Sequence, residues 1–193
     1  MKTEQWLSLF KEHNDINIFH INHLRLLTGM RSHSLRVNLS RLNAKKVIKR
    51  ICREFYANPF NTPTLEEISN QIYQPSYISL ESALYFWGIL NQVPYVLTCV
   101  STQPPRKFNT SFGTIEYRQI KKGFFWGFVD KGGYFIAEPE KALLDYLYLN
   151  KGRHIQLDLS EINLNEVNSA KIKFYAEKMG IKIDSYLHQL GSG

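Results

Sequence analysis

The chain has 193 residues, a hydrophobic content of 44% and a formal charge of +7 at pH 7. This length allows one domain or two small ones, and the apolar content excludes a chain too polar to bury a core. The charge is uneven, because residues 1–60 hold 11 Lys and Arg against 4 Asp and Glu, whereas residues 61–193 hold 13 cationic and 13 anionic residues. The sequence therefore predicts a small basic module joined to a neutral one.

The cysteine content and the hydropathy pattern bear on location. Two isolated cysteines, Cys52 and Cys99, do not make a disulfide framework or a metal cluster, so we expect reduced thiols and a cytoplasmic protein. The N-terminal stretch MKTEQWLSLFKEHND lacks the apolar core of a signal peptide. The longest apolar run, residues 83–90, has 8 residues, against roughly 20 for a helix that spans a bilayer. We therefore expect no membrane partner.

The first 60 residues predict three helices and a hairpin. Helices are expected over residues 5–13 and 22–27, and Thr28-Gly29 ends the second because glycine suits a left-handed C-terminal position. Ser32 or Ser34 can cap a third helix that runs to about Ala44. Two β-prone runs follow at residues 47–49 and 54–57. This order within residues 1–60 is typical of a winged helix-turn-helix.

Residues 64–193 predict a second domain of mixed α/β content, so the fold class is α+β. The predicted helices are a capped helix at 65–72, a buried apolar helix at 80–90, a helix opened by Glu138-Pro139 and running through Leu149, and a last helix at 166–179. The predicted strands are a central strand at 93–100, an antiparallel pair at 112–120 and 124–129, and a short strand at 134–137.

The third predicted helix has one apolar face and one cationic face. At 100° per residue, Leu35, Leu39 and Leu42 share a narrow arc that would face the module. The opposite face carries His33, Arg36, Val37, Ser40, Arg41 and Ala44. Arginines can bind guanine edges bidentately, and small or apolar residues let a helix lie deep in a groove. Seven cations and no anion lie between Arg36 and Arg53, which favours binding to double-stranded DNA.

Other constellations are weaker. His20 and His23 are one helical turn apart, but no third ligand is placed beside them, so we expect no metal and no cofactor. Glu138, Glu140 and Asp145 invite a nuclease interpretation, yet they lie on or just before one helix, and two of them fit an ordinary acidic first turn. We therefore predict no catalytic residue and no enzymatic activity.

Two stretches in the second half, YISLESALYFWGIL (77–90) and AEPEKALLDYLYL (137–149), resemble paired signatures of the AbiEi-type antitoxins. These are the antitoxin and autorepressor components of type IV toxin–antitoxin systems. The resemblance implies an N-terminal winged helix that binds inverted repeats in its own promoter and a C-terminal antitoxin domain. The implied functional partner is a toxin of nucleotidyltransferase type, often without a stable complex. Binding to the paired repeats would need two protomers, which could form a homodimer on DNA.

The resemblance also places the residues that read DNA. They fall on the third helix and on the predicted wing: Ser32, His33, Ser34, Arg36, Val37, Ser40, Arg41, Lys45, Lys46, Lys49, Arg50 and Arg53. Many members of the family carry glycine before and within the wing, whereas this chain has Val47 and Arg53-Glu54 there. The residues of the two signatures are explained by packing in the core, so we assign no residue to antitoxin activity.

Two alternatives remain open. A winged-helix transcription factor with a ligand-sensing C-terminal domain predicts a sizeable pocket with a few convergent polar groups in residues 64–193. A nucleic-acid-processing enzyme predicts carboxylates gathered within metal distance. A solid second core with dispersed acids would instead favour the antitoxin.

Overall fold

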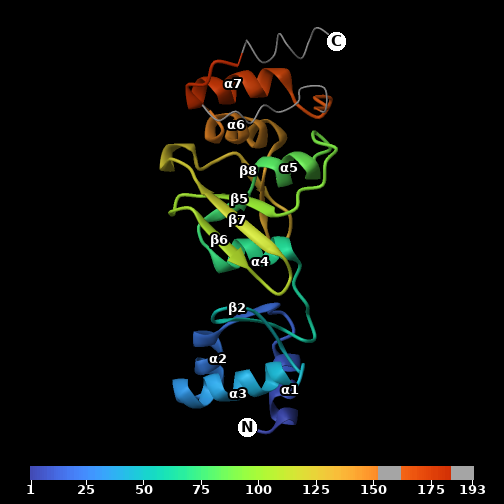
Figure 1. The fold of residues 1–193 in the computed structure, drawn as a ribbon, viewed down its shortest axis with the longest axis vertical. Coiled ribbons are helices and arrows are strands. Elements are labelled where there is room, and N and C mark those ends of the chain that lie inside the picture. Colours follow the sequence, from blue (N-terminus) through green and yellow to red (C-terminus); the bar gives the residue numbers. More distant parts are fainter. Residues whose placement is uncertain (152–161, 184–193) are drawn as a thin grey trace.

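The computed structural model describes residues 1–151 and 162–183 and has a mixed α+β fold. Figure 1 shows an elongated molecule, with three helices and a small sheet at the end that holds the N-terminus and a larger sheet with further helices beyond it. The helices of the described residues are α1 (Thr3–Glu12), α2 (Ile21–Thr28), α3 (Ser32–Ala44), α4 (Leu65–Ile72), α5 (Leu80–Phe86), the short 3-10 helix η1 (Lys122–Phe124), α6 (Pro139–Leu149) and α7 (Ser169–Met179).

The strands form two separate sheets. Their bounds are β1 (Ile18–His20), β2 (Lys49–Cys52), β3 (Phe55–Ala57), β4 (Ser76–Ile78), β5 (Leu97–Ser101), β6 (Arg106–Asn109), β7 (Thr114–Gln119), β8 (Phe128–Asp130) and β9 (Phe135–Ala137). The first sheet has the order β1-β3-β2 and is antiparallel throughout. The second has the order β6-β7-β5-β4-β9-β8, in which β7 runs parallel to β5 and β4 runs parallel to β9.

The elements from α1 to β3, here called the N-terminal unit, share a hydrophobic cluster. The fully buried side chains at its centre include Trp6, Phe10, Phe19, Leu24 and Leu35. The predicted third helix is confirmed at Ser32–Ala44, and Gly29 ends α2 with a φ of 64°, as expected for its left-handed position. The predicted serine cap is wrong, because Arg31 occupies the cap position and makes no side-chain cap bond.

Asn58, at the C-terminal end of the N-terminal unit, binds the segment between α1 and β1. This fully buried side chain has its amide nitrogen within hydrogen-bonding distance of three carbonyl oxygens, of Phe10 at 3.1 Å, His13 at 3.0 Å and Ile16 at 2.8 Å. Its carbonyl oxygen accepts the N–H of Phe60 at 3.0 Å. Asn58, the residue that follows β3, thus fixes the C-terminal end of α1 and the segment that leads into β1.

The rest of the chain surrounds a second, larger hydrophobic cluster. The residues around the six-stranded sheet supply most of it, but Ile18, Ile51 and Ala57 of the N-terminal unit also belong to it. In Figure 1, α4 lies at the end of the sheet nearer the N-terminal unit, and α5, α6 and α7 lie at the far end. The three-stranded sheet therefore packs against the larger unit, while α3 lies on the outer side.

A four-residue turn joins the two units. Residues 110–113 connect β6 to β7, and the Ser111 N–H donates to the Ile51 carbonyl at 3.0 Å. The Ser111 hydroxyl donates to the Arg50 carbonyl at 2.8 Å. The Thr110 hydroxyl donates to the Gly113 carbonyl at 2.7 Å and accepts the N–H groups of Phe112 and Gly113, so the turn is internally braced. Strand β2 is thus held directly by the larger unit.

Several strand predictions in the second half are wrong. The central strand begins at Leu97 and not at Val93, and Tyr95 in the preceding segment is 99% exposed. Residues 112–120 and 124–129 are not a hairpin, because β7 pairs with β5 and β6 whereas β8 pairs with β9. The helix predicted over 80–90 ends at Phe86, and Phe86 itself is 46% exposed. The helices at Leu65–Ile72 and Pro139–Leu149 are confirmed.

No helix in the described parts of the chain has both the length and the apolar character needed to cross a membrane.

Candidate nucleic-acid interface

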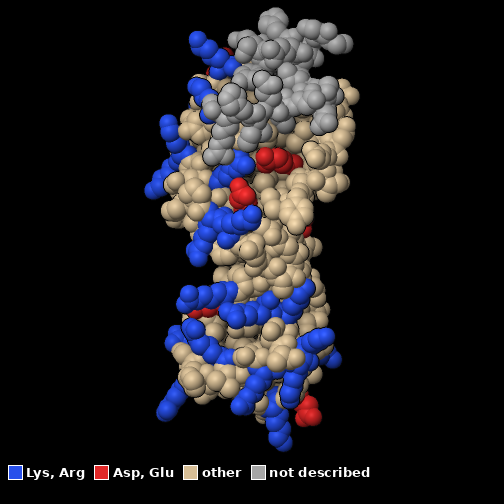
Figure 2. All heavy atoms as spheres, viewed as in Figure 1, with Lys and Arg blue, Asp and Glu red and all other residues tan. Residues whose placement is uncertain are grey.

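Helix α3 presents the predicted DNA-reading side chains to solvent. Leu35, Leu39 and Leu42 are buried against the N-terminal unit, which fixes the opposite face outward. The exposed predicted residues on this helix and the turn after it are Ser32, His33, Ser34, Arg36, Ser40, Arg41, Lys45 and Lys46, and Val37 is half-buried. Figure 2 shows Lys and Arg side chains gathered over this end of the molecule, with few acids among them. The face predicted from the sequence is therefore accessible to a large polyanion.

One acid reaches this face from outside the helix. The Glu54 carboxylate accepts a hydrogen bond from the Arg36 guanidinium at 3.2 Å, and His20 Nε2 lies 3.8 Å from its other oxygen. Glu54 lies in the turn between β2 and β3, with a φ of 71° that directs the chain back toward α3. The stretch from Arg36 to Arg53 has no anion in sequence, but Glu54, the next residue, brings one to Arg36 in space. No local sequence pattern indicates this contact, since the two residues are 18 positions apart.

A small cavity lies between α3 and the β2–β3 hairpin. Its volume is about 240 Å³, and its lining includes Arg36, Arg50, Arg53 and Glu54. The Asn43 side-chain carbonyl accepts the Arg50 N–H at 2.9 Å, which ties the end of α3 to the start of the hairpin. The cavity therefore brings Arg36 of α3 together with Arg50 and Arg53 of the hairpin, along with the Glu54 carboxylate. Such a set can bind phosphate oxygens at the junction of helix and hairpin.

The predicted DNA-contacting lysines differ in their surroundings. Lys45 and Lys46 are exposed at the turn that leaves the helix, and Lys46 has a φ of 57°. Lys49 instead lies over the Phe112 ring of the larger unit, with its ammonium 3.8 Å from the ring centroid. A cation so close to an aromatic face is partly engaged already. The structure therefore brings Lys45 and Lys46, but not Lys49, to the open end of the interface.

The histidine pair has ordinary partners. His20 Nδ1 accepts the Asn22 N–H at 3.3 Å and caps α2, and the His23 ring lies 5.6 Å from the Phe19 ring. Within residues 1–151 and 162–183, no three His, Cys, Asp or Glu side chains are grouped so that they could hold a metal ion.

The carboxylates that invited a nuclease interpretation are bound by cations and hydroxyls. Glu138 accepts from Lys171 at 2.9 Å and from the Tyr175 hydroxyl at 2.6 Å, and Lys171 also lies 3.2 Å from Glu140. Burial alone would raise the pKa of Glu138, but these hydrogen bonds outweigh it and lower the pKa. Glu138 and Glu140 thus join α6 to α7.

Asp145 belongs to a separate, fully buried cluster. Its carboxylate pairs with the Lys141 ammonium and accepts from the hydroxyls of Tyr77 at 2.8 Å and Ser79 at 2.9 Å. Lys141 also donates to the Tyr77 hydroxyl oxygen at 2.9 Å. Burial raises the pKa of Asp145 and lowers the pKa of Lys141. Sequence reasoning missed this pair, although its spacing of four residues on a helix is the spacing of a side-chain contact.

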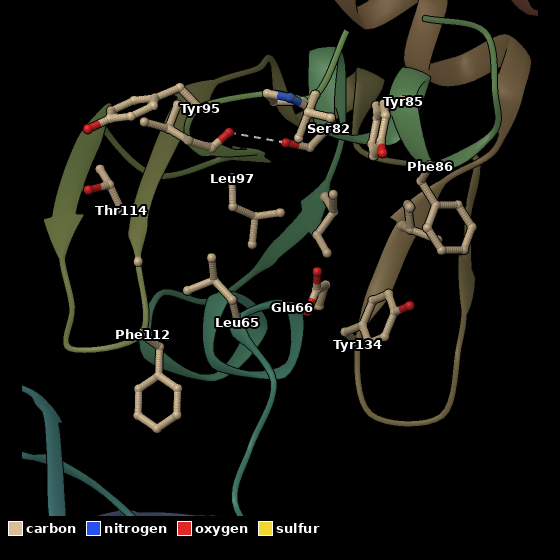
Figure 3. A pocket seen from close by; sticks show the side chains of 16 residues that line it. Leu65, Glu66, Ser82, Tyr85, Phe86, Tyr95, Leu97, Phe112, Thr114 and Tyr134 are labelled. Atoms are coloured by element: carbon tan, nitrogen blue, oxygen red, sulfur yellow. Dashed lines mark hydrogen bonds between the residues drawn. The ribbon is translucent and has the colours of Figure 1, made fainter. Parts of the chain in front are cut away.

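The larger unit also contains a pocket, shown in Figure 3. Its volume is about 430 Å³, within the range of small-molecule sites. Five of its lining side chains are aromatic and one, Glu66, is charged; the aromatic residues are Tyr85, Phe86, Tyr95, Phe112 and Tyr134. Burial, with Glu66 and Glu67 nearby, raises the pKa of the Tyr134 phenol. This is the kind of cavity that the ligand-sensing alternative predicts.

Comparison with known proteins does not extend these observations. The chain matches no protein-family model, and no curated protein is significantly similar to it.

Proposed function

We propose that this protein is a sequence-specific transcriptional repressor that binds double-stranded DNA through α3. The N-terminal unit would act as a winged helix-turn-helix, with α3 in the major groove and the β2–β3 hairpin as the wing. The observation that carries the proposal is the cationic outer face of α3, which buried leucines hold toward solvent. The three arginines at the junction of α3 and the hairpin support it, because phosphates flank a groove that a helix enters.

The second part of the proposal is that the larger unit, over residues 64–193, is the antitoxin of a type IV pair and counteracts a nucleotidyltransferase toxin. Its support is the resemblance of residues 77–90 and 137–149 to paired family signatures. These two stretches touch each other: Tyr77 and Ser79 donate to Asp145, and the Trp87 indole donates to the Ala137 carbonyl at 2.8 Å. Their shared contacts give a physical reason for the two stretches to occur together.

DNA binding is tested by titrating the full chain into a duplex that contains its own promoter. Arg41→Ala should weaken binding by about 1–3 kcal/mol, roughly ten- to a hundredfold, if Arg41 contacts a base edge. Lys11→Ala is the matched control, because Lys11 is an exposed cation on α1. Equal losses for both variants would indicate nonspecific attraction, and no loss for Arg41→Ala would reject a groove-facing α3.

Antitoxin activity is tested by co-expression with a nucleotidyltransferase toxin, taken from the adjacent gene if that gene encodes one. The full chain should relieve growth arrest, and Arg41→Ala should relieve it equally if expression is driven from an unrelated promoter. Failure of the wild-type chain to relieve arrest would remove the antitoxin part and leave the repressor part standing. Protection from nuclease at both halves of an inverted repeat would support a pair of protomers on DNA.

A ligand-sensing transcription factor is the second candidate. The pocket of about 430 Å³ in the larger unit is the observation that favours it. It shares the DNA-binding proposal and differs only in the role of residues 64–193.

A further inference from the structure

The pocket in Figure 3 combines an apolar lining with one negative charge. Its walls come from α4, the β4–α5 segment, the segment that leads into β5, the turn between β6 and β7 with the first residue of β7, and the segment of Tyr134 and β9. Glu66 is the one charged residue among the lining side chains. In Figure 3 its carboxylate lies beside Tyr134, with Tyr85 and Phe86 farther round the same pocket. Aromatic faces and a carboxylate both attract an organic cation.

The Glu66 side chain takes no part in the cap of its own helix. The capping box at the start of α4 is formed by Thr64 and Glu67, whose carboxylate accepts the Thr64 N–H at 2.7 Å. Among the residues that the structure describes, no ion pair includes Glu66. Two of the lining rings already have a cation over them, because Lys131 lies 5.6 Å from the Phe86 centroid and Lys49 lies 3.8 Å from the Phe112 centroid. The Tyr134 and Tyr85 sides of the pocket thus remain for a ligand.

We propose that this pocket binds a small apolar molecule with an ammonium group, placed against Glu66 and Tyr134, and that its occupancy changes the position of the β2–β3 hairpin. The binding part stands without the proposed function, whereas the effect on DNA rests on it.

The turn at residues 110–113 connects the two sites. Phe112 and Gly113 line the pocket, and Gly113 is so close to Leu65 that a Cβ there would lie 2.8 Å from Leu65 Cδ2. The same turn holds β2 through Ser111, and the Lys49 ammonium of β2 lies over the Phe112 ring of the turn. A ligand that displaces Leu65 or Phe112 therefore moves a braced turn and the strand bonded to it. The hairpin that follows carries Glu54, which binds Arg36 on α3.

Binding is tested by calorimetry on the full chain with three probes of similar size: 2-phenylethylammonium, 2-phenylethanol and phenylacetate. The ammonium compound should bind at least about tenfold more tightly than the alcohol, and phenylacetate should bind weakest. Glu66→Gln should remove this preference, and Glu177→Gln on the exposed face of α7 should keep it. No binding by any probe, or the same preference in Glu66→Gln, would overturn the site.

The connection is tested by measuring promoter affinity with and without saturating 2-phenylethylammonium. Affinity should change at least about threefold, and DNA should change the affinity for the probe by the same factor. Glu66→Gln at the same probe concentration controls for ionic strength. Ser111→Ala should reduce the factor, whereas Ser169→Ala on α7 should leave it unchanged. Probe binding with unchanged DNA affinity would refute the connection. A chain that binds the probe but never DNA would instead refute the proposed repressor.

Discussion

At the scale of single residues, the ion pair between Arg36 and Glu54 modifies the proposed interface. Arg36 is exposed, yet its guanidinium is already bonded to a carboxylate that would lie near a phosphate or a base. If the proposed interface binds DNA, an arginine in this state would exchange one anionic partner for another. Its net contribution to DNA affinity would therefore be smaller than that of Arg41, which lies on the same face.

Removing the carboxylate should strengthen DNA binding. Glu54→Gln keeps the shape of the side chain, removes one negative charge from the interface and frees Arg36, so we expect promoter affinity to rise about three- to tenfold. The measurement is a fluorescence anisotropy titration at fixed salt. Glu12→Gln, which removes the same charge from the exposed end of α1, should have a smaller effect. A fall in affinity would instead mean that Glu54 orients Arg36 for DNA.

The sequence predicted the face of α3 but not what the side chains there touch. The arc of Leu35, Leu39 and Leu42 fixed the orientation of the helix, because helical periodicity is a local property. The contact of Glu54 with Arg36 and that of Lys49 with Phe112 depend on where the chain returns in space. The pocket was equally hidden, since its lining comes from five separate segments.

At the scale of elements, the helices were better predicted than the strands. Thr64 caps α4 as expected, with Glu67 as the second member of a capping box, and Pro139 opens α6 as expected, because these signals lie within one turn of the chain. The strand pairing of β7 was mispredicted because one of its two partners, β5, is parallel and comes from a separate segment of the chain. The residues between the two predicted strands form the 3-10 helix η1 and not a hairpin turn. Val93 and Tyr95 have strand-forming side chains but lie at the pocket, largely exposed.

The buried pair on α6 makes a sharp prediction for stability. Asp145→Asn leaves the Lys141 ammonium buried without its counter-charge, so the free energy of unfolding should fall by about 3–5 kcal/mol. Adding Lys141→Met removes the unpaired charge while the asparagine carbonyl can still accept from Tyr77 and Ser79. The double variant should therefore be more stable than Asp145→Asn alone in urea unfolding. A double variant as unstable as the sum of both single changes would contradict this account.

The junction of α6 and α7 makes a prediction for pH dependence. The pKa of Glu138 is lowered in the folded protein, so its contribution is present above the ordinary carboxyl pKa and is lost as the pH falls through the lowered value. Tyr175→Phe removes the hydrogen bond to Glu138 and should lower stability at pH 7 by about 1 kcal/mol. The difference from wild type should vanish in strong acid. Tyr95→Phe, at a fully exposed phenol, should show no difference at either pH.

At the scale of the whole molecule, the boundary of the excess positive charge and the boundary between the two hydrophobic clusters do not coincide. The excess cations lie in residues 1–60, which agrees with the first hydrophobic cluster. The second cluster nevertheless includes Ile18, Ile51 and Ala57, so the three-stranded sheet faces both cores. The N-terminal unit is thus not independent of the rest in its packing.

A fragment of residues 1–63 should therefore be less stable than the same unit in the full chain. Its Ile51 side chain, buried in the full chain, would lose its cover, and burial of an isoleucine contributes about 1.5–3 kcal/mol. Hydrogen exchange of the α3 amides, measured in both proteins, should show weaker protection in the fragment. Full-chain Ser111→Ala should give an intermediate value. Equal protection in the fragment and the full chain would show that the larger unit adds nothing to the N-terminal one.

The position of Asn58 has a consequence for how the protein is made. Its side chain binds the carbonyls of Phe10 and Ile16, at the end of α1 and just before β1, yet it lies 48 and 42 residues after them in the chain. During synthesis, the helix that would read DNA emerges from the ribosome well before this closing amide does. We therefore expect that a nascent chain that stops short of residue 58 does not fold its N-terminal unit stably. Such a chain would then not bind a promoter before synthesis has passed residue 58.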